Sequence, residues 1–307
     1  MIMNPFRPML TLLVAALMLT SCGRSIEVKP IAKNSTTEHA RRIVVLGGEL
    51  SETLVTLGAE NRIVAVDSTS TRPPRLQKLP NVGYLRQVNV EGVLSLRPDL
   101  ILASHDAGPA EVLDRWRQLG IEVKQLTTGP LIEQALSAIS TLGDIVGESA
   151  KAKKLVAHNR RALDTLPALE LQPRVLFLLS KAGNLPLVAG TATKAHVMIE
   201  TAQGHNVAAT FSGYKPMTAE AIVKLAPDII LVASHGLASF GGLESLRKDP
   251  AVKLTPAGRS GRIQAVDSQL MLSMGPRLGE AVSMLHSAFA KSLPLKAVPQ
   301  VAQQDRP

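Results

Sequence analysis

The chain has 307 residues, which is more than one compact core usually holds and suits two domains. Apolar residues make up 45% of the chain and aromatic residues only 3%, so each of its two tyrosines is notable. The formal net charge of +9 favours anionic partners, but Lys and Arg are scattered and accompany no recognition motif, which argues against a nucleic-acid partner.

The first residues are typical of export. Arg7 precedes the apolar run Met9–Leu19, which is as long as a signal peptide needs and too short to span a bilayer. The run ends in Leu-Thr-Ser-Cys22, similar to a bacterial lipobox, in which the cysteine is lipidated. An ordinary signal peptide followed by a chance cysteine is the alternative. We predict a signal peptide over residues 1–21, a lipid anchor at Cys22 and a polar tether over residues 22–40.

An α/β pattern begins after the tether. Short apolar runs alternate with helix-like segments, at 42–46, 51–57, 63–66, 90–96, 100–103 and 110–119. Near-continuous apolar strands that alternate with helices are typical of a buried, mostly parallel sheet. We therefore expect residues 41–142 to form an N-terminal α/β lobe.

The middle of the chain has a helical pattern without proline, in which Gly143 and Gly147 are weak points. The later part of this segment is rich in Lys, Arg and Ala. It predicts a connecting helix over residues 143–168 and a second α/β lobe over residues 172–292. The last residues, 293–307, contain three prolines and no apolar periodicity, so a disordered tail is expected.

The second half of the chain repeats the first. Residues 91–102 (EGVLSLRPDLIL) align with residues 220–231 (EAIVKLAPDIIL) at an offset of 129, as from Glu91 to Glu220. Two further pairs match in the same order, Tyr84 with Tyr214 and His105 with His235. Two similar α/β lobes imply a cleft, because ligands of such sheets bind beyond the carboxyl ends of the strands.

Four motifs share features with one family: residues 79–99 (LPNVGYLRQVNVEGVLSLRPD), 190–193 (GTAT), 213–221 (GYKPMTAEA) and 274–277 (MGPR). They resemble class III substrate-binding proteins of ABC importers, most strongly the periplasmic haemin-binding proteins of the HmuT type, over residues 41–291. The resemblance implies two Rossmann-like lobes with mostly parallel sheets joined by one long helix. It also implies that haem b is held between the lobes by a tyrosinate iron ligand.

Within that resemblance, Tyr84 is the expected iron ligand. A phenolate is a known ligand of haem iron, but the usual tyrosine pKa near 10 means that it needs help to ionise. On an extended loop Arg86 would face the same side, and its permanent cation would favour the phenolate. From the residues alone, the alternative is a half-buried loop tyrosine beside an unrelated surface arginine.

Other residues are candidates for the pocket. Tyr214 has no arginine two residues later, and it is a candidate second axial ligand or pocket wall. Arg277 is expected to bind a propionate or the phenolate, and its alternative is an exposed residue at a helix start. Three histidines are candidate iron or metal ligands, although a single loop histidine is more often merely solvated: His105, His196 and His235.

Glu91 and Glu220 occupy equivalent positions near helix starts, where the helix dipole favours a carboxylate. That is a sufficient structural reason for both. The resemblance adds a second reason, in which one carboxylate per lobe meets arginines of a permease dimer that works with its ATPase. It also implies an outer-membrane haem receptor upstream.

The expected function is therefore capture of haem in the periplasm or cell envelope and its delivery to an ABC importer, without catalytic residues or a catalytic cofactor. A cobalamin or ferric-siderophore binder of the same class is the main alternative. Those ligands arrive with their metal already coordinated and need no protein phenolate. A metal-dependent hydrolase using His105 and His235 is disfavoured, because the sequence contains no His-Glu-x-x-His, Gly-x-Ser-x-Gly or Walker motif.

Overall fold

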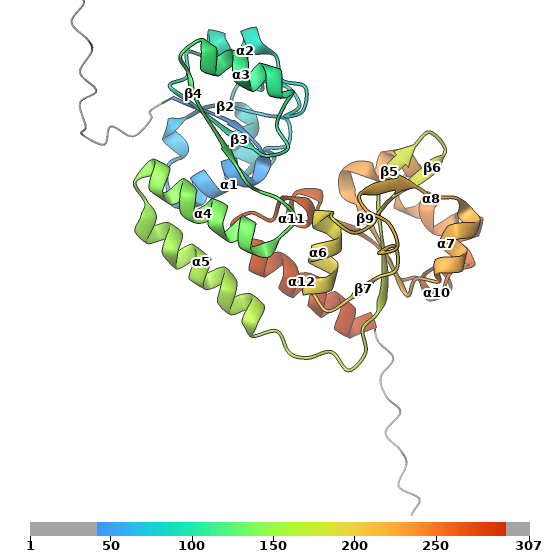
Figure 1. The fold of residues 1–307 in the computed structure, drawn as a ribbon. Coiled ribbons are helices and arrows are strands. Elements are labelled where there is room, and N and C mark those ends of the chain that lie inside the picture. Colours follow the sequence, from blue (N-terminus) through green and yellow to red (C-terminus); the bar gives the residue numbers. More distant parts are fainter. Residues whose placement is uncertain (1–41, 293–307) are drawn as a thin grey trace, which may run out of the picture. The chain divides into compact units, whose positions relative to one another are not determined.

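The computed structural model describes residues 42–292, which belong to one compact unit (Figure 1). The predicted signal peptide, Cys22, the tether and the C-terminal tail lie outside the described residues. None of the helices within 42–292 is long and apolar enough to cross a membrane. The lobes are described below by their sheets, each with its helices.

The N-terminal lobe contains a parallel four-stranded sheet in the order β2-β1-β3-β4. Its strands are β1 (Ile43–Leu46), β2 (Ile63–Val66), β3 (Leu100–Ser104) and β4 (Glu122–Leu126). Its helices are α1 (Gly48–Leu57), α2 (Val90–Ser95) and α3 (Ala110–Gln118). The alternation predicted from the apolar runs is confirmed, except that α1 begins three residues earlier than expected.

Side chains of β1 alternate between two cores, which explains why the run is apolar throughout. Ile43 and Val45 pack with residues of α1 and of the later helix α4 (Ile132–Val146). Val44 and Leu46 pack with residues of α2 and α3, including the fully buried Trp116. Figure 1 shows these two helix layers on opposite faces of the sheet.

The C-terminal lobe contains a six-stranded sheet in the order β10-β9-β5-β6-β8, with β7 also pairing with β5. Its strands are β5 (Arg174–Ala182), β6 (Leu185–Ala189), β7 (His205–Asn206), β8 (Tyr214–Pro216), β9 (Ile229–Ala233) and β10 (Ile263–Val266). Strands β7, β9 and β10 belong to the parallel part, whereas β6 runs antiparallel to both β5 and β8. The fold class is confirmed, and this antiparallel edge distinguishes the second lobe from the first.

Helices cover both faces of this second sheet as well. Phe177 and Leu231 pack with α6 (Lys194–Thr201) and α12 (Leu278–Ser292), while Leu176 and Val232 face the opposite layer. That layer comprises α7 (Ala219–Leu225), η3 (Ser234–Phe240), α8 (Leu243–Lys248), α9 (Pro250–Lys253) and α10 (Pro256–Arg259). The short helix α11 (Ser268–Ser273) precedes α12.

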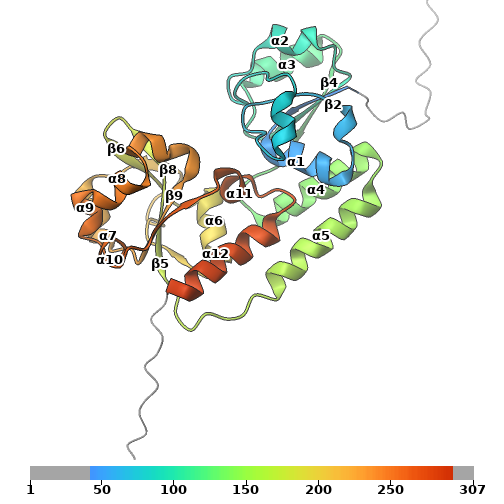
Figure 2. The same ribbon diagram turned by 180° about the vertical axis from the view of Figure 1, so that it is seen from behind.

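The helical middle of the chain is two helices, α4 and α5 (Ser149–Asp164), so the single connecting helix predicted over 143–168 is wrong in its bounds. Gly147 ends α4 in the left-handed conformation, at a φ of 74°. Gly143 permits the close approach of α5, because a Cβ there would lie 2.3 Å from the Cβ of Ala152. Seen from behind in Figure 2, α5 runs along the outside of the molecule beside α4 and α12.

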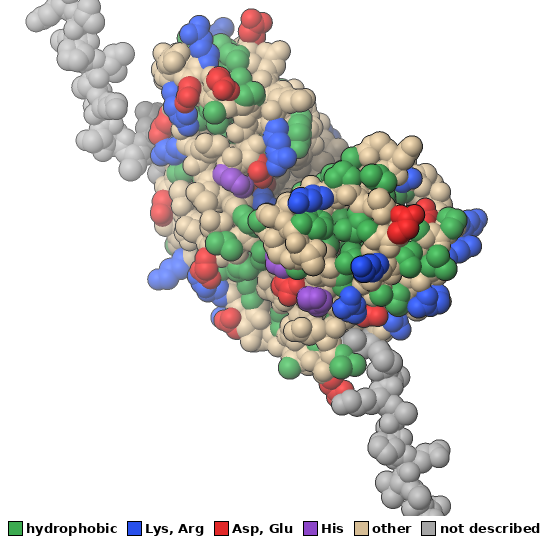
Figure 3. Space-filling view, turned by 45° about the vertical axis from the view of Figure 1, so that its right-hand side comes forward, with side chains coloured by type: hydrophobic (Ala, Val, Ile, Leu, Met, Phe, Trp, Pro, Cys, Tyr) green, Lys and Arg blue, Asp and Glu red, His purple; other side chains and the backbone are tan. Residues whose placement is uncertain are grey.

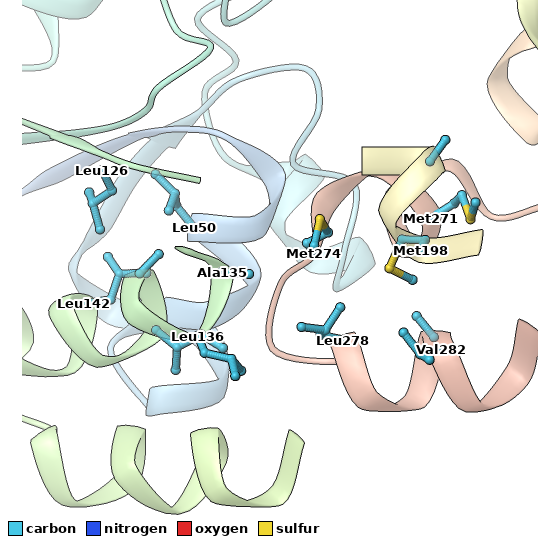
Figure 4. Packing of buried hydrophobic residues seen from close by; sticks show 14 of the residues in the cluster. Leu50, Leu126, Ala135, Leu136, Leu142, Met198, Met271, Met274, Leu278 and Val282 are labelled. Carbon is cyan, nitrogen blue, oxygen red and sulfur yellow. The ribbon is translucent and has the colours of Figure 1, made fainter. Parts of the chain in front are cut away.

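One apolar core joins the two lobes. It contains residues of α1 and α4 together with residues of α6, α11 and α12, among them Met198, Met271 and Leu278 (Figure 4). The buried Asn159 of α5 fixes the start of α12, since its amide donates to the Pro276 carbonyl (2.9 Å) and its oxygen accepts from the Gly279 N–H (2.7 Å). The helices between the lobes therefore share the core of both.

Candidate functional site

Tyr84 lies on a loop held at the carboxyl ends of the N-terminal strands. Gly83 accepts a hydrogen bond from the Ser68 N–H (2.8 Å), just after β2, and Leu85 accepts one from the Gly108 N–H (2.9 Å), after β3. The loop is thus fixed by its backbone to the ends of β2 and β3, the two strands that flank β1. The phenol side chain of Tyr84 is 44% exposed and available to a ligand.

Arg86 does not follow Tyr84 on an extended segment, as the sequence suggested. The Gln87 N–H donates to the Tyr84 carbonyl (2.7 Å), so residues 84–87 form a tight turn. The guanidinium of Arg86 is directed to Asp106, with 3.0 Å between Nη2 and Oδ1. Nε2 of His105 lies 3.7 Å from the same carboxylate oxygen. The loop after β3 therefore supplies the counter-charge of Arg86.

Tyr214 lies on β8 of the other lobe and is half-buried. Burial raises its pKa to about 12; Arg86 acts to lower that pKa and Asp106 to raise it. These two charges belong to the N-terminal lobe, so Tyr214 is close enough to the Arg86–Asp106 pair to feel its field. Figure 3 shows a notch in the surface between the lobes, with basic side chains on both of its sides.

The histidines predicted from the repeat lie at strand ends, but they do not form one cluster. Nδ1 of His105 is 3.4 Å from the Thr128 hydroxyl, and Nδ1 of His235 is 2.7 Å from the Ser268 hydroxyl. Burial lowers the pKa of His235. His196 contacts residues of its own lobe, with Nδ1 3.3 Å from the amide nitrogen of Asn206. Across residues 42–292, no group of three or more His, Cys, Asp or Glu side chains is arranged to hold a metal ion.

Arg277 meets a carboxylate that sequence reasoning missed. Its Nε donates to Oε1 of Glu52 on α1 (2.5 Å), and the Glu52 side chain is only 10% exposed. Burial alone would lower the pKa of Arg277, but Glu52 outweighs that effect and the pKa is raised. Among residues 42–292, no acceptor forms a hydrogen bond with the buried Nη2 of Arg277. Arg277 therefore joins the lobes and still has a free donor.

Further polar contacts join the lobes beside this ion pair. Gln269 of α11 accepts from the Thr71 hydroxyl (2.5 Å) and donates to Oε2 of Glu52 (3.1 Å). Arg72 forms an ion pair with Asp267, the residue that caps α11. A helix beginning Gly-Glu-Leu-Ser-Glu places two carboxylates among uncharged residues, and that pattern was the available signal for this junction.

Glu91 and Glu220 are both exposed in the first turns of α2 and α7. Asn89 caps α2 by accepting from the N–H of Glu91 (2.9 Å), and Thr218 caps α7 by accepting from the N–H of Ala221 (3.3 Å). The Glu220 backbone N–H and the Thr218 side chain lower the pKa of Glu220. The equivalence predicted from the repeat is present in the local structure of both helices.

Comparison with known proteins gives a consistent family. The model of the family described as periplasmic binding protein matches residues 43–270. A solved structure of a periplasmic heme-binding protein, RhuT from Roseiflexus sp. RS-1, is 36% identical with a TM-score of 0.78, covering 82% of this chain and 99% of that one. An uncharacterized ABC transporter substrate-binding lipoprotein of Bacillus subtilis, YvrC, is 28% identical, covering 89% of this chain and 93% of the relative.

A third relative has a different ligand in its name. A cobalamin-binding protein of Halobacterium salinarum is 29% identical, with 85% of this chain and 73% of the relative covered. The family match spans most of the chain and includes the strands of both sheets. The role is therefore that of a substrate-binding protein that works with an ABC permease and its ATPase, and the chain belongs to the periplasmic binding protein family.

Proposed function

We propose that this protein captures haem between its lobes and delivers it to an ABC importer. The observation that supports this best is the placement of the chain's two tyrosines around one ion pair. Tyr84 lies two residues from Arg86, and Tyr214 of the other lobe feels the charges of Arg86 and Asp106. A planar ligand between the lobes would meet one phenol on each side.

In this proposal the Tyr84 phenolate is the ligand of the haem iron, since ferric iron accepts phenolate oxygen. Arg86, which is paired with Asp106, supplies a permanent cation on the same loop. Tyr214 has a pKa of about 12, which keeps it protonated at neutral pH. We therefore assign Tyr214 to the pocket wall or to hydrogen-bond donation, rather than to a second phenolate.

The remaining candidates have supporting roles in the proposal. The free Nη2 of Arg277 is a donor for a haem propionate, provided that the ligand reaches the junction between the lobes. His105 lies beside Asp106 near the Tyr84 loop, so it is the histidine placed best for a second iron ligand. His196 and His235 have partners within the C-terminal lobe.

Delivery requires export and docking. We propose that Cys22 carries the lipid anchor of an envelope protein, as in the Bacillus relative, which is named a lipoprotein. Glu91 and Glu220, one on each lobe and both exposed, are proposed to contact the two halves of a permease dimer. An outer-membrane haem receptor is the proposed upstream supplier.

Binding of haemin and of cyanocobalamin to the purified protein distinguishes the proposal from its main alternative, which the cobalamin-binding relative favours. We expect haemin to give a saturable visible spectrum with a tyrosinate-to-iron charge-transfer band, and cyanocobalamin to give no heat of binding by calorimetry. Tight cyanocobalamin binding without a haemin spectrum would replace haem by cobalamin as the ligand.

A further inference from the structure

Helix α5 has a buried side and a basic side. Its buried residues are Ala152 and Asn159, and Leu155 and Leu163 pack against the shared core. The exposed side carries the cationic residues Lys153, Lys154 and Arg161, with His158 between them. At 100° per residue these four side chains lie within an arc of about 140°, so they form one continuous face of the helix.

None of the cations of this basic face forms an ion pair within residues 42–292, although Asp164 lies on the same face of α5. Elsewhere on α5, Lys151 pairs with Glu148 (3.0 Å) and Arg160 pairs with Glu133 (2.6 Å). Within the described part of the chain, no carboxylate forms an ion pair with any of the three face cations, Lys153, Lys154 and Arg161. Fixed cations that outnumber the carboxylates on their face attract an anionic partner.

The position of α5 indicates which anionic partner fits. Arg62, just before β2, donates to the Val146 carbonyl at the end of α4 (3.1 Å), and Lys151 of α5 donates to the Leu57 carbonyl (3.2 Å). Strands β1 and β2 are parallel, so the start of α5 lies at the amino-end edge of the sheet, where the described chain begins. Tyr84 follows the carboxyl end of β2, at the opposite edge of the same sheet.

We propose that the basic face of α5 rests on an anionic phospholipid surface. Nineteen residues lie between Cys22 and Arg42, and a chain of that length spans at most about 70 Å. A lipid on Cys22 would thus keep the fold close to a bilayer, where a weak charge contact acts at high effective concentration. With α5 on the lipid, the carboxyl-end loops that carry Tyr84 are not covered by the same contact.

The proposed contact is electrostatic, and no part of the helix is inserted into the bilayer. The other side chains within the arc are those of Ala150, Ala157, His158 and Asp164, so the face keeps a net positive charge and contains no large apolar or aromatic side chain that would enter the acyl region. Each cation near an anionic surface contributes about a fivefold factor in partition at low ionic strength, and salt screens that contribution. Three cations on one rigid helix therefore give a measurable, salt-sensitive partition.

The test uses the chain from residue 22 with Cys22→Ser, so that no lipid anchor contributes. Its partition onto vesicles is measured by co-sedimentation, with phosphatidylglycerol and phosphatidylcholine in equal parts or with phosphatidylcholine alone. We expect binding only to the anionic vesicles, and release at high salt. Neutralising the face, as Lys153→Gln with Lys154→Gln and Arg161→Gln, should reduce partition at least about tenfold.

A matched variant controls for total charge. Lys224→Gln, Lys248→Gln and Lys253→Gln remove the same charge from exposed positions on α7, α8 and α9, and they should change partition less than about twofold. Exchanging the face cations, Lys153→Arg, Lys154→Arg and Arg161→Lys, should preserve binding. Circular dichroism and urea unfolding confirm that every variant is folded.

Equal losses in the two neutralised variants, failure of the parent chain to bind anionic vesicles, or equal binding to both kinds of vesicle would overturn the proposal. None of these outcomes depends on which ligand occupies the cleft, because the vesicle measurement requires no haem.

Discussion

The two lobes carry the same short motif in different surroundings. In the N-terminal lobe, Tyr84 lies on a backbone-anchored loop beside a four-stranded parallel sheet, and its side chain is 44% exposed. In the C-terminal lobe, Tyr214 belongs to β8, an antiparallel edge strand that the first sheet lacks. Burial on that strand raises the Tyr214 pKa to about 12. A repeat in sequence therefore does not give two equivalent phenols.

This difference indicates a division of roles. An exposed phenol on an anchored loop suits a group that must reach the metal of a ligand, whereas a half-buried phenol with a raised pKa suits a neutral contact. The junction between the lobes belongs to neither repeat. Glu52, Arg277 and Gln269 join the two lobes there through contacts that have no counterpart within either lobe. Variants of Tyr84, of Tyr214 and of the junction residues test this division of roles separately.

The largest expected effect is loss of the iron ligand. Tyr84→Phe should abolish the charge-transfer band and weaken haemin binding by at least about 100-fold, since even an outer partner of a metal ligand costs about 10- to 100-fold. Tyr214→Phe should retain the band and change affinity less than about tenfold. The measurement is a visible titration with haemin. A normal band in Tyr84→Phe and its loss in Tyr214→Phe would reverse the assignment of the two lobes.

The next effect concerns the junction. Glu52→Ala leaves the partly buried guanidinium of Arg277 without its carboxylate, and we expect a loss of about 2 kcal/mol in the free energy of unfolding, because Arg277 retains some solvent contact. Glu60→Ala breaks an exposed ion pair with Arg75 and should cost less than about 1 kcal/mol. Urea unfolding measures both. Equal losses would show that the ion pair between the lobes has no special weight.

Sequence patterns predicted the layers of the fold well, because apolar runs report burial directly. The strands at 42–46, 63–66 and 100–103 and the helix at 90–96 are present at nearly the expected bounds. The break between α4 and α5 was visible only as Gly147, since a glycine in a helical pattern does not say whether the helix continues. The antiparallel strands β6 and β8 were missed because Leu185–Ala189 and Tyr214–Pro216 are too short to show a period.

The sequence predicted where the candidate site residues lie in the fold, but not which side chains they contact. The repeat identified Tyr84, Tyr214 and the histidines at strand ends, because loops after parallel strands meet at one edge. It did not identify the Asp106 partner of Arg86, which depends on a tight turn at Tyr84–Gln87. Glu52 and Arg277 are separated by 225 residues, so only the tertiary structure brings them together.

A smaller effect, confined to alkaline pH, tests the burial of Tyr214. Its folded-state pKa of about 12 exceeds the usual value of 10, so the unfolded state loses this proton first as the pH rises. The stability that the group contributes is complete below pH 10 and is lost progressively between about pH 10 and 12. In Tyr84→Phe, phenolate absorbance should therefore appear only near pH 12. Ionisation near pH 10 with the fold intact would show that Tyr214 is solvated.

The smallest effect concerns the places where the lobes are most alike. Glu91 and Glu220 start equivalent helices and are both exposed, so a two-fold permease would meet one carboxylate on each side. Exposed charges at a rim steer association more than they add affinity, and salt screens them. Glu91→Lys with Glu220→Lys should leave haemin binding unchanged and reduce stimulation of the transporter ATPase about fivefold at low salt, and less at high salt.

Each single reversal, Glu91→Lys or Glu220→Lys, should reduce that stimulation about twofold, because the other lobe still engages. Glu111→Lys and Glu244→Lys, which reverse exposed carboxylates in the first turns of α3 and α8, are the matched controls. They share the helix-start position but not the repeat. If the controls reduce ATPase stimulation as much as Glu91→Lys and Glu220→Lys, the effect is one of net charge. The equivalence of the two carboxylates would then reflect only the dipole of each helix, which favours an acid at its first turn.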